Sequence, residues 1–165
     1  MRTMRFSAFL TAALLVLMCL TSGAQSPQSA KEAEHNRKGM QHYSEAFYQH
    51  LPKGKQREAD QSFELAISEF RQAIAANPRF ADPYRNLARL YYVKKDFLQA
   101  ADAYKRFLSL EPRDVDAYLQ LALSYTELDR FPEAIQTLET ARRQTADPEV
   151  RSKLDGYLTK LKDRN

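Results

Sequence analysis

The residues whose types could support chemistry are few and widely spaced. His35, His42 and His50 lie seven and eight residues apart. On a helix, seven residues correspond to about 10 Å, whereas histidines that chelate one metal from a helix lie three or four residues apart. We therefore predict no metal site and interpret the three histidines as solvated, with a weak metal site shared between chains as the alternative.

The residues needed for nucleophilic or phosphate chemistry are also missing. The only cysteine, Cys19, lies near the N-terminus, and the four glycines form no phosphate-binding loop. The aromatic residues recur at positions that fit helix packing, which disfavours a buried small-molecule site. The sequence thus predicts a protein that is not an enzyme, with no cofactor, no metal and no small-molecule substrate.

The first 24 residues have the composition of an export signal. Arg2 and Arg5 precede an apolar run over residues 6–20, and Ser22-Gly23-Ala24 supplies small residues for a signal peptidase. The apolar run is shorter than the ~20 residues that span a bilayer. We therefore expect cleavage after Ala24 and a periplasmic or secreted protein.

Two alternatives would keep the protein at a membrane. The apolar run could remain as an uncleaved anchor, or Cys19 could carry a lipid. Lipidation is disfavoured because Leu17-Met18 precede Cys19, where small residues are needed. If cleavage follows Ala24, the mature chain has no cysteine and its stability depends on packing alone.

The charge of the chain gives no indication of a nucleic-acid partner. The formal net charge is +4, from 25 basic and 21 acidic residues. Arg2 and Arg5 belong to the predicted signal, and without them the balance is 23 to 21, a net charge of +2. No block of like charge stands out, so binding to nucleic acid is not predicted.

Apolar residues recur with a period of 34, which is typical of stacked helical repeats. Within each copy the three recurring residues lie at i, i+3 and i+7, on one face of a helix. The middle residue is alanine, which lets a second helix approach closely. The recurring sets are Phe63, Ala66 and Phe70; Phe97, Ala100 and Tyr104; and Phe131, Ala134 and Leu138.

Helix-stop and helix-start signals divide the chain between these copies. Pro52, Pro78 and Pro112 follow the ends of three expected helices, and Asp82-Pro83 and Asp147-Pro148 are expected to cap the helices that follow. Residues 53–60 carry charge without a large apolar side chain, so we expect an exposed connection or a frayed first helical turn there. The expected helices are 31–51, 60–76, one from 82, 97–110, one from 116, one from 131, and one from 147.

The recurring residues resemble the tetratricopeptide repeat. Tyr84-x-x-Leu87-Ala88-x-x-Tyr91 is followed by Ala100-x-x-x-Tyr104 and Pro112, and Tyr118-x-x-Leu121-Ala122-x-x-Tyr125 is followed by Ala134 and Leu138. Tyrosine replaces the family's usual tryptophan, and alanine its usual glycine. The resemblance implies an all-α fold: a right-handed superhelical stack of antiparallel helix pairs.

The first copy departs from this pattern. Arg57 stands 34 residues before Tyr91 and cannot replace its packing. A better first helix covers residues 36–43, with Gly39 at the small-residue position, and needs about 15 extra residues before the second helix. The expected organisation is a signal at 1–24, a linker at 25–30, a divergent repeat at 31–80, repeats at 81–114 and 115–148, and a capping helix at 149–163.

The resemblance also implies that the first helix of each pair lines a concave groove for a protein segment. We expect an apolar and an arginine-rich end, which suits a partner with apolar and acidic side chains. The alternative is that Leu119 and Leu123 pack on the neighbouring helix. The predicted groove residues are Asn36, Met40, Tyr43, Arg85, Arg89, Tyr92, Leu119, Leu123 and Thr126.

The resemblance and the expected export signal together predict a non-catalytic scaffold of the bacterial cell envelope that binds a peptide or helix of another protein. The residues that grip a terminal carboxylate in co-chaperone members of the family are not reproduced. The alternative function is a membrane-tethered structural subunit of a secretion, pilus or cytochrome-maturation assembly. In either case, contact with a membrane would come only through an uncleaved or lipidated N-terminus.

Overall fold

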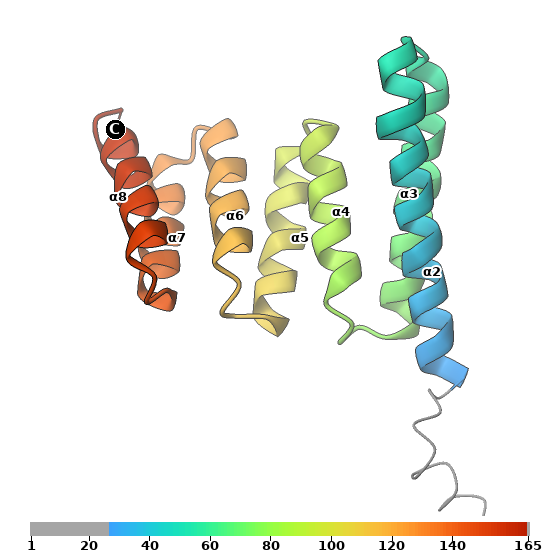
Figure 1. The fold of residues 1–165 in the computed structure, drawn as a ribbon, viewed down its shortest axis with the longest axis horizontal. Coiled ribbons are helices and arrows are strands. Elements are labelled where there is room, and N and C mark those ends of the chain that lie inside the picture. The colour runs from blue at the N-terminus through green and yellow to red at the C-terminus, as the bar shows by residue number, and fades with distance from the viewer. Residues whose placement is uncertain (1–26, 165) are drawn as a thin grey trace, which may run out of the picture.

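A computed structural model describes residues 27–164, which form seven α-helices and no strand (Figure 1). The expected signal, residues 1–24, lies outside the described residues. Within them, no helix is both long and apolar enough to cross a membrane. The helices are α2 (Pro27–Ser44), α3 (Gln56–Ala76), α4 (Asp82–Val93), α5 (Phe97–Leu110), α6 (Val115–Glu127), α7 (Phe131–Gln144) and α8 (Pro148–Lys162).

The helices pair in chain order, which gives the stack of helix pairs expected from the 34-residue period. α2 packs on α3, α4 on α5, and α6 on α7, while α8 packs on α7 at the end of the stack (Figure 1). Alanines at the recurring position are fully buried, with Ala66, Ala100 and Ala134 each at 0% exposure. Small residues thus lie where neighbouring helices approach most closely.

Three aspartates cap helices, although not all at the expected places. Asp96, Asp114 and Asp147 accept hydrogen bonds from backbone N–H groups in the first turns of α5, α6 and α8. The expected cap at Asp82 is wrong, because Asp82 is already helical and Ala81 precedes it. The Asp82 carboxylate instead accepts a hydrogen bond from Arg85 Nη2 at 2.9 Å.

The extra residues of the first pair lengthen its helices rather than forming a loop. After α2 the chain continues through a π-helical segment (Glu45–His50) and a 3₁₀ turn (Leu51–Lys53), and Gly54 reverses it with φ +68°. Helix α3 then begins at Gln56, so the connection expected at 53–60 is mostly helical. Its Ala59 is 0% exposed and belongs to the same core cluster as Ala46. Closely packed helices need no large apolar residue there.

Helix α2 also begins earlier than expected, at Pro27, so residues 27–30 are helical rather than a linker. Its register against α3 is set by Gly39. A Cβ atom at Gly39 would lie 2.5 Å from Cε1 of the buried Phe70 ring. Gly39 therefore occupies the small-residue position of the first pair, as Ala88 and Ala122 do in the next two.

The core consists of two clusters along the stack. One joins the first pair to α4 through residues such as Phe63, Phe70 and Leu90. The other runs from α4 to the end of α8 and includes Tyr104, Leu138 and Leu154. Leu154, Leu158 and Leu161 of α8 are all buried, so the last helix belongs to the core.

Candidate protein-binding face

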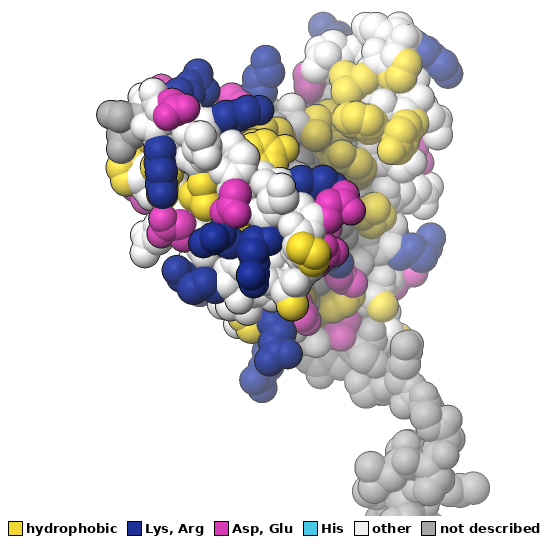
Figure 2. All heavy atoms as spheres, turned by 60° about the vertical axis from the view of Figure 1, so that its left-hand side comes forward, with side chains coloured by type: hydrophobic (Ala, Val, Ile, Leu, Met, Phe, Trp, Pro, Cys, Tyr) yellow, Lys and Arg dark blue, Asp and Glu magenta, His cyan; other side chains and the backbone are white. Residues whose placement is uncertain are grey.

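The first helices of the pairs, together with α8, present one side of the stack, which we call the inner face. The space-filling view shows a hollow between the first pair and the rest of the molecule, with hydrophobic side chains gathered on the wall formed by that pair (Figure 2). The nine predicted groove residues lie on α2, α4 and α6. Their contacts divide them into structural residues and residues available to a partner.

On α2 the three predicted residues have different environments. Asn36 is half-buried, and its Oδ1 accepts a hydrogen bond from Asn86 Nδ2 of α4 at 2.9 Å. The Tyr43 ring is half-buried beside Phe47 and Phe63, with ring centroids 5.8 and 5.9 Å away. Met40 is 41% exposed. Met40 is therefore the predicted residue of α2 with the largest free apolar surface.

On α4 the arginines expected to act together have separate roles. Arg85 pairs with Asp82 at 2.9 Å and Asp114 at 3.3 Å, and its guanidinium lies 4.9 Å from the centre of the Phe107 ring. It thus ties α4 to α5 and to the start of α6. Arg89 is exposed, and no carboxylate within residues 27–164 pairs with it. Of these two arginines, Arg89 is therefore the one whose charge is available to a partner.

Substitution of the two arginines should separate these roles. We expect Arg85→Ala to lower the free energy of unfolding by about 1–2 kcal/mol through the loss of partly screened ion pairs and the ring contact. We expect Arg89→Ala to change it by less than about 0.5 kcal/mol. Urea unfolding of both variants checks this. A larger loss for Arg89→Ala would contradict the assignment.

Arg89 lies within electrostatic reach of two tyrosines. Burial raises the pKa of Tyr104 to about 12, and the positive charge of Arg89 opposes that rise. Burial likewise raises the pKa of Tyr43, again opposed by Arg89. Burial also raises the pKa of Tyr92, whose ring stands edge-on to Phe97 with centroids 5.2 Å apart. The Arg89 charge on the inner face thus stands beside phenols that burial keeps neutral.

The raised pKa of Tyr104 predicts a loss of stability in alkali. Folding favours the neutral phenol, so its contribution is complete below pH 10 and is lost as the pH rises through about 12. A shift of this size corresponds to about 2–3 kcal/mol. Unfolding measured between pH 9 and pH 12 should show the loss in the wild type and a smaller one in Tyr104→Phe. Equal losses would contradict the prediction.

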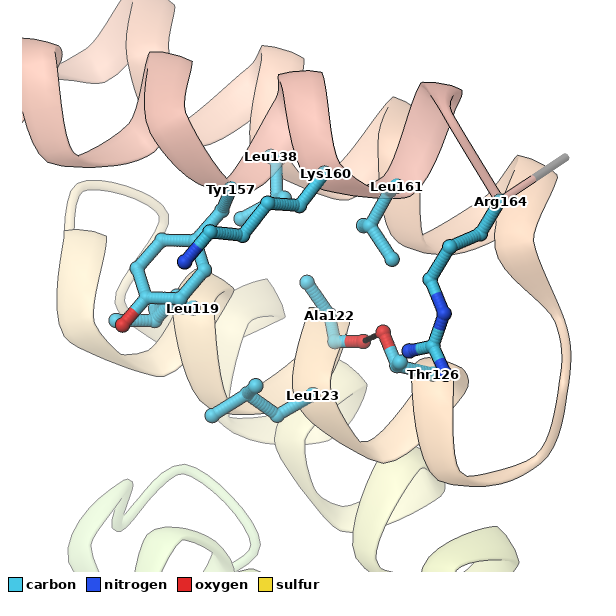
Figure 3. A pocket seen from close by; sticks show the side chains of 9 residues that line it. All are labelled: Leu119, Ala122, Leu123, Thr126, Leu138, Tyr157, Lys160, Leu161 and Arg164. Atoms are coloured by element: carbon cyan, nitrogen blue, oxygen red, sulfur yellow. Dashed lines mark hydrogen bonds between the residues drawn. The ribbon is translucent and has the colours of Figure 1, made fainter.

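On α6 the predicted residues border a cavity that continues onto α8. Thr126 donates a hydrogen bond to the Ala122 carbonyl at 2.9 Å, and Leu119 packs against the core. Leu123 is half-buried and lines a cavity of about 140 Å³ together with Leu119 (Figure 3). The cavity is lined by Leu119, Ala122, Leu123, Thr126, Leu138, Tyr157, Lys160, Leu161 and Arg164.

Three residues of α8 and one that follows it line this cavity and were missed in the sequence: Tyr157, Lys160, Leu161 and, after the helix, Arg164. Helix α8 had been expected only to cap the stack. The missed signal is one further step of 34 residues, because Tyr157 follows Leu123 and Lys160 follows Thr126 by that interval. Gly156 likewise follows Ala122. Helix α8 thus repeats the pattern of a first helix and extends the inner face.

The histidines differ from the expected solvated set. His35 Nδ1 lies 2.7 Å from Glu69 Oε2, and the His35 side chain is 28% exposed. His42 Nδ1 lies 3.4 Å from Glu45 Oε2. These contacts give His35 and His42 structural partners within the first pair. Residues 27–164 contain no group of three His, Cys, Asp or Glu residues arranged to hold a metal ion.

Comparison with known proteins identifies the repeats. Two family profiles described as tetratricopeptide repeat match residues 51–106 and 93–154, which together include helices α3 to α7. The chain is built of tetratricopeptide repeats. The resemblance to tetratricopeptide repeats is thereby confirmed, and so is the all-α stack of helices.

Solved tetratricopeptide repeat domains share this fold. The TPR2B domain of yeast Sti1, in a complex with pHsp70, has a TM-score of 0.63 at 18% identity and covers 83% of this chain and 100% of its own. The N-terminal domain of stress-induced protein-1 from C. elegans has a TM-score of 0.64 at 16% identity, covering 80% and 98%. At these identities the likeness establishes the fold alone.

Two further similarities concern a peptide complex and an enzyme. The first TPR of Spaghetti (RPAP3), bound to an HSP90 peptide, has a TM-score of 0.56 at 17% identity, covering 78% of this chain and 94% of its own. A UDP-N-acetylglucosamine–peptide N-acetylglucosaminyltransferase of Giardia intestinalis is 29% identical over 94 residues. That match covers 57% of this chain but 6% of the enzyme.

Proposed function

We propose that this protein is a non-catalytic scaffold that holds a peptide or helix of a partner protein against its inner face. The observation that carries the proposal is a set of corresponding residues, one from each inner helix: Met40, Arg89, Leu123 and Tyr157. Met40 and Tyr157 are 41% and 40% exposed, Arg89 has an unpaired charge among the described residues, and Leu123 borders a cavity.

The chemistry of these residues suits an extended surface of a protein better than a small molecule. Arg89 supplies a charge that can orient a partner, while Met40, Leu123 and Tyr157 supply apolar area that a partner can bury. The yeast Sti1 and RPAP3 domains that share this fold carry pHsp70 and an HSP90 peptide in their structures. Both support a protein segment as the class of ligand.

Photo-crosslinking in cells tests the proposal. A photoreactive phenylalanine analogue at Met40 should form a stoichiometric adduct with one partner protein, identified by mass spectrometry. The matched control is Lys105, whose side chain is 51% exposed on α5, away from the inner face. No adduct from Met40, or the same adducts from both positions, would overturn the proposal.

We also propose that the scaffold acts in the bacterial cell envelope, because residues 1–24 resemble an export signal. The competing proposal is a membrane-tethered structural subunit of a secretion, pilus or cytochrome-maturation assembly, in which the N-terminal segment is retained or lipidated at Cys19. The intact mass of the native protein separates them. A chain beginning at Gln25 supports the exported scaffold, and a retained or lipidated N-terminus supports the tethered subunit.

A further inference from the structure

The cavity between α6, α7 and α8 is an apolar hollow open toward the inner face. Leu138 of α7 is 1% exposed and Leu161 of α8 is 7% exposed at its base, while Leu119 and Leu123 come from α6 (Figure 3). Its volume is about 140 Å³. An engineered apolar cavity of about 150 Å³ binds benzene, so this hollow has room for one large apolar side chain.

Two cations stand at the edge of this cavity. Lys160 lies in the last turn of α8, and Arg164 follows just after the helix ends at Lys162. The Lys160 side chain extends toward Tyr157 and the Arg164 side chain toward Thr126, on either side of Leu161 (Figure 3). No carboxylate within residues 27–164 pairs with either one. By contrast, Lys153 pairs with Glu149 at 2.8 Å and Lys162 pairs with Glu139 at 3.6 Å. Both cations beside the cavity are thus left available to a carboxylate of a partner.

This arrangement indicates the chemistry of the occupant. The apolar base of the cavity favours a large apolar side chain, because filling the cavity removes the surface of that side chain and the surface of the cavity wall from water. An unpaired cation on either side of the cavity favours carboxylates in the partner, since guanidinium and ammonium groups form charge-assisted hydrogen bonds with them. Tyr157, which is 40% exposed, adds a ring with an apolar body and a polar hydroxyl to the lining of the cavity.

We infer that this cavity is a specificity subsite that holds one leucine-sized or aromatic side chain of a partner segment, with Lys160 on one side and Arg164 on the other available to bind an Asp or Glu side chain next to it. The inference rests on the proposed function, because it assigns a partner chemistry to one end of the inner face. The segment formed by α8 and the residues just after it then has two roles. Leu154 and Leu158 hold the stack together, while Tyr157, Lys160 and Arg164 select the ligand.

Selection from a random peptide library displayed on phage tests this subsite with the full chain as bait. We expect the selected peptides to share a large apolar residue beside Asp or Glu. In synthetic copies, changing the acidic residue to Lys should weaken binding at least about tenfold, and so should changing the apolar residue to Ala. No shared motif, or one without an acidic residue, would overturn the inference.

Variants of α8 assign the preference to this site. Lys160→Glu with Arg164→Glu should remove the preference for the acidic residue, and Leu123→Ser should weaken binding of the synthetic peptide about tenfold. Lys153→Glu makes the same kind of charge change elsewhere on α8 and should retain the motif. An unchanged preference in the double variant would contradict the subsite.

Two readouts keep the result interpretable. Circular dichroism should show native unfolding for each variant, and Lys160→Ala with Arg164→Ala serves if charge reversal unfolds α8. An adduct through Met40 with no α8-dependent peptide preference would retain the scaffold and reject the subsite. An α8-dependent preference with no adduct through Met40 would retain the subsite and reject the proposed use of the whole inner face.

Discussion

Truncation after Thr145 should both destabilise the protein and remove one end of the binding surface. The loss follows from α8, whose Leu154, Leu158 and Leu161 are 2%, 7% and 7% exposed and share a core cluster with Leu138. Leu154→Ala alone should cost about 2–5 kcal/mol by leaving a cavity. Removal of the whole helix should cost at least as much and expose apolar surface to aggregation.

The loss of the binding surface follows from Tyr157, Lys160, Leu161 and Arg164, which line the cavity beside α6. Truncation therefore removes side chains that line the inner face as well as the helix that caps the stack. Thermal unfolding, light scattering and binding of a library-selected peptide measure the combined effect. Wild-type stability after truncation would show α8 to be an independent tail. Wild-type peptide binding would show that its side chains take no part in recognition.

Gly39→Ala and Gly156→Ala should change stability in opposite directions. In α2, a Cβ atom at Gly39 would lie 2.5 and 2.7 Å from ring atoms of Phe70, which is 0% exposed and cannot move aside without repacking. We expect a loss of about 1–3 kcal/mol from overpacking. In α8, a Cβ atom at Gly156 meets nothing within 4 Å. Alanine there should stabilise the helix by about 0.5–1 kcal/mol.

The two glycine variants make the same chemical change, so their difference isolates the contact with Phe70. Urea unfolding should place Gly39→Ala below and Gly156→Ala above the wild type. Phe70→Leu in the Gly39→Ala background should cost less than in the wild type, because the smaller side chain relieves the overlap. A stabilising Gly39→Ala would show that α2 and α3 do not meet in this register.

The fold could be predicted from the sequence because the 34-residue period of the apolar residues matches the packing of the helices. Phe97 begins α5 and Phe131 begins α7, as the recurring motif indicated. The predicted helix boundaries were wrong where small residues take the place of large ones in the core. Ala59 carried no visible apolar signal, yet it is fully buried in the extended first pair. Asp82 failed as a cap because the helix begins one residue earlier than its Asp-Pro signal suggested.

The candidate site could be predicted only in part, because helical spacing gives a face but not its contacts. The 34-residue period indicates that Arg85 and Leu119 occupy corresponding positions. It cannot indicate that Asp114, 29 residues after Arg85, pairs with Arg85 across the turn before α6. The residues of α8 were accessible from the same period, but the charges around Tyr157 resemble those of any solvated helix.

The central claim is that the inner face of α2, α4, α6 and α8 binds a protein partner. Backbone amide NMR spectra, recorded with and without the partner identified through the Met40 crosslink, test it most directly. We predict the largest chemical-shift changes on those four helices, including the segments around Arg89, Leu123 and Tyr157. Changes confined to α3, α5 and α7, with the inner helices unaffected, would contradict the account.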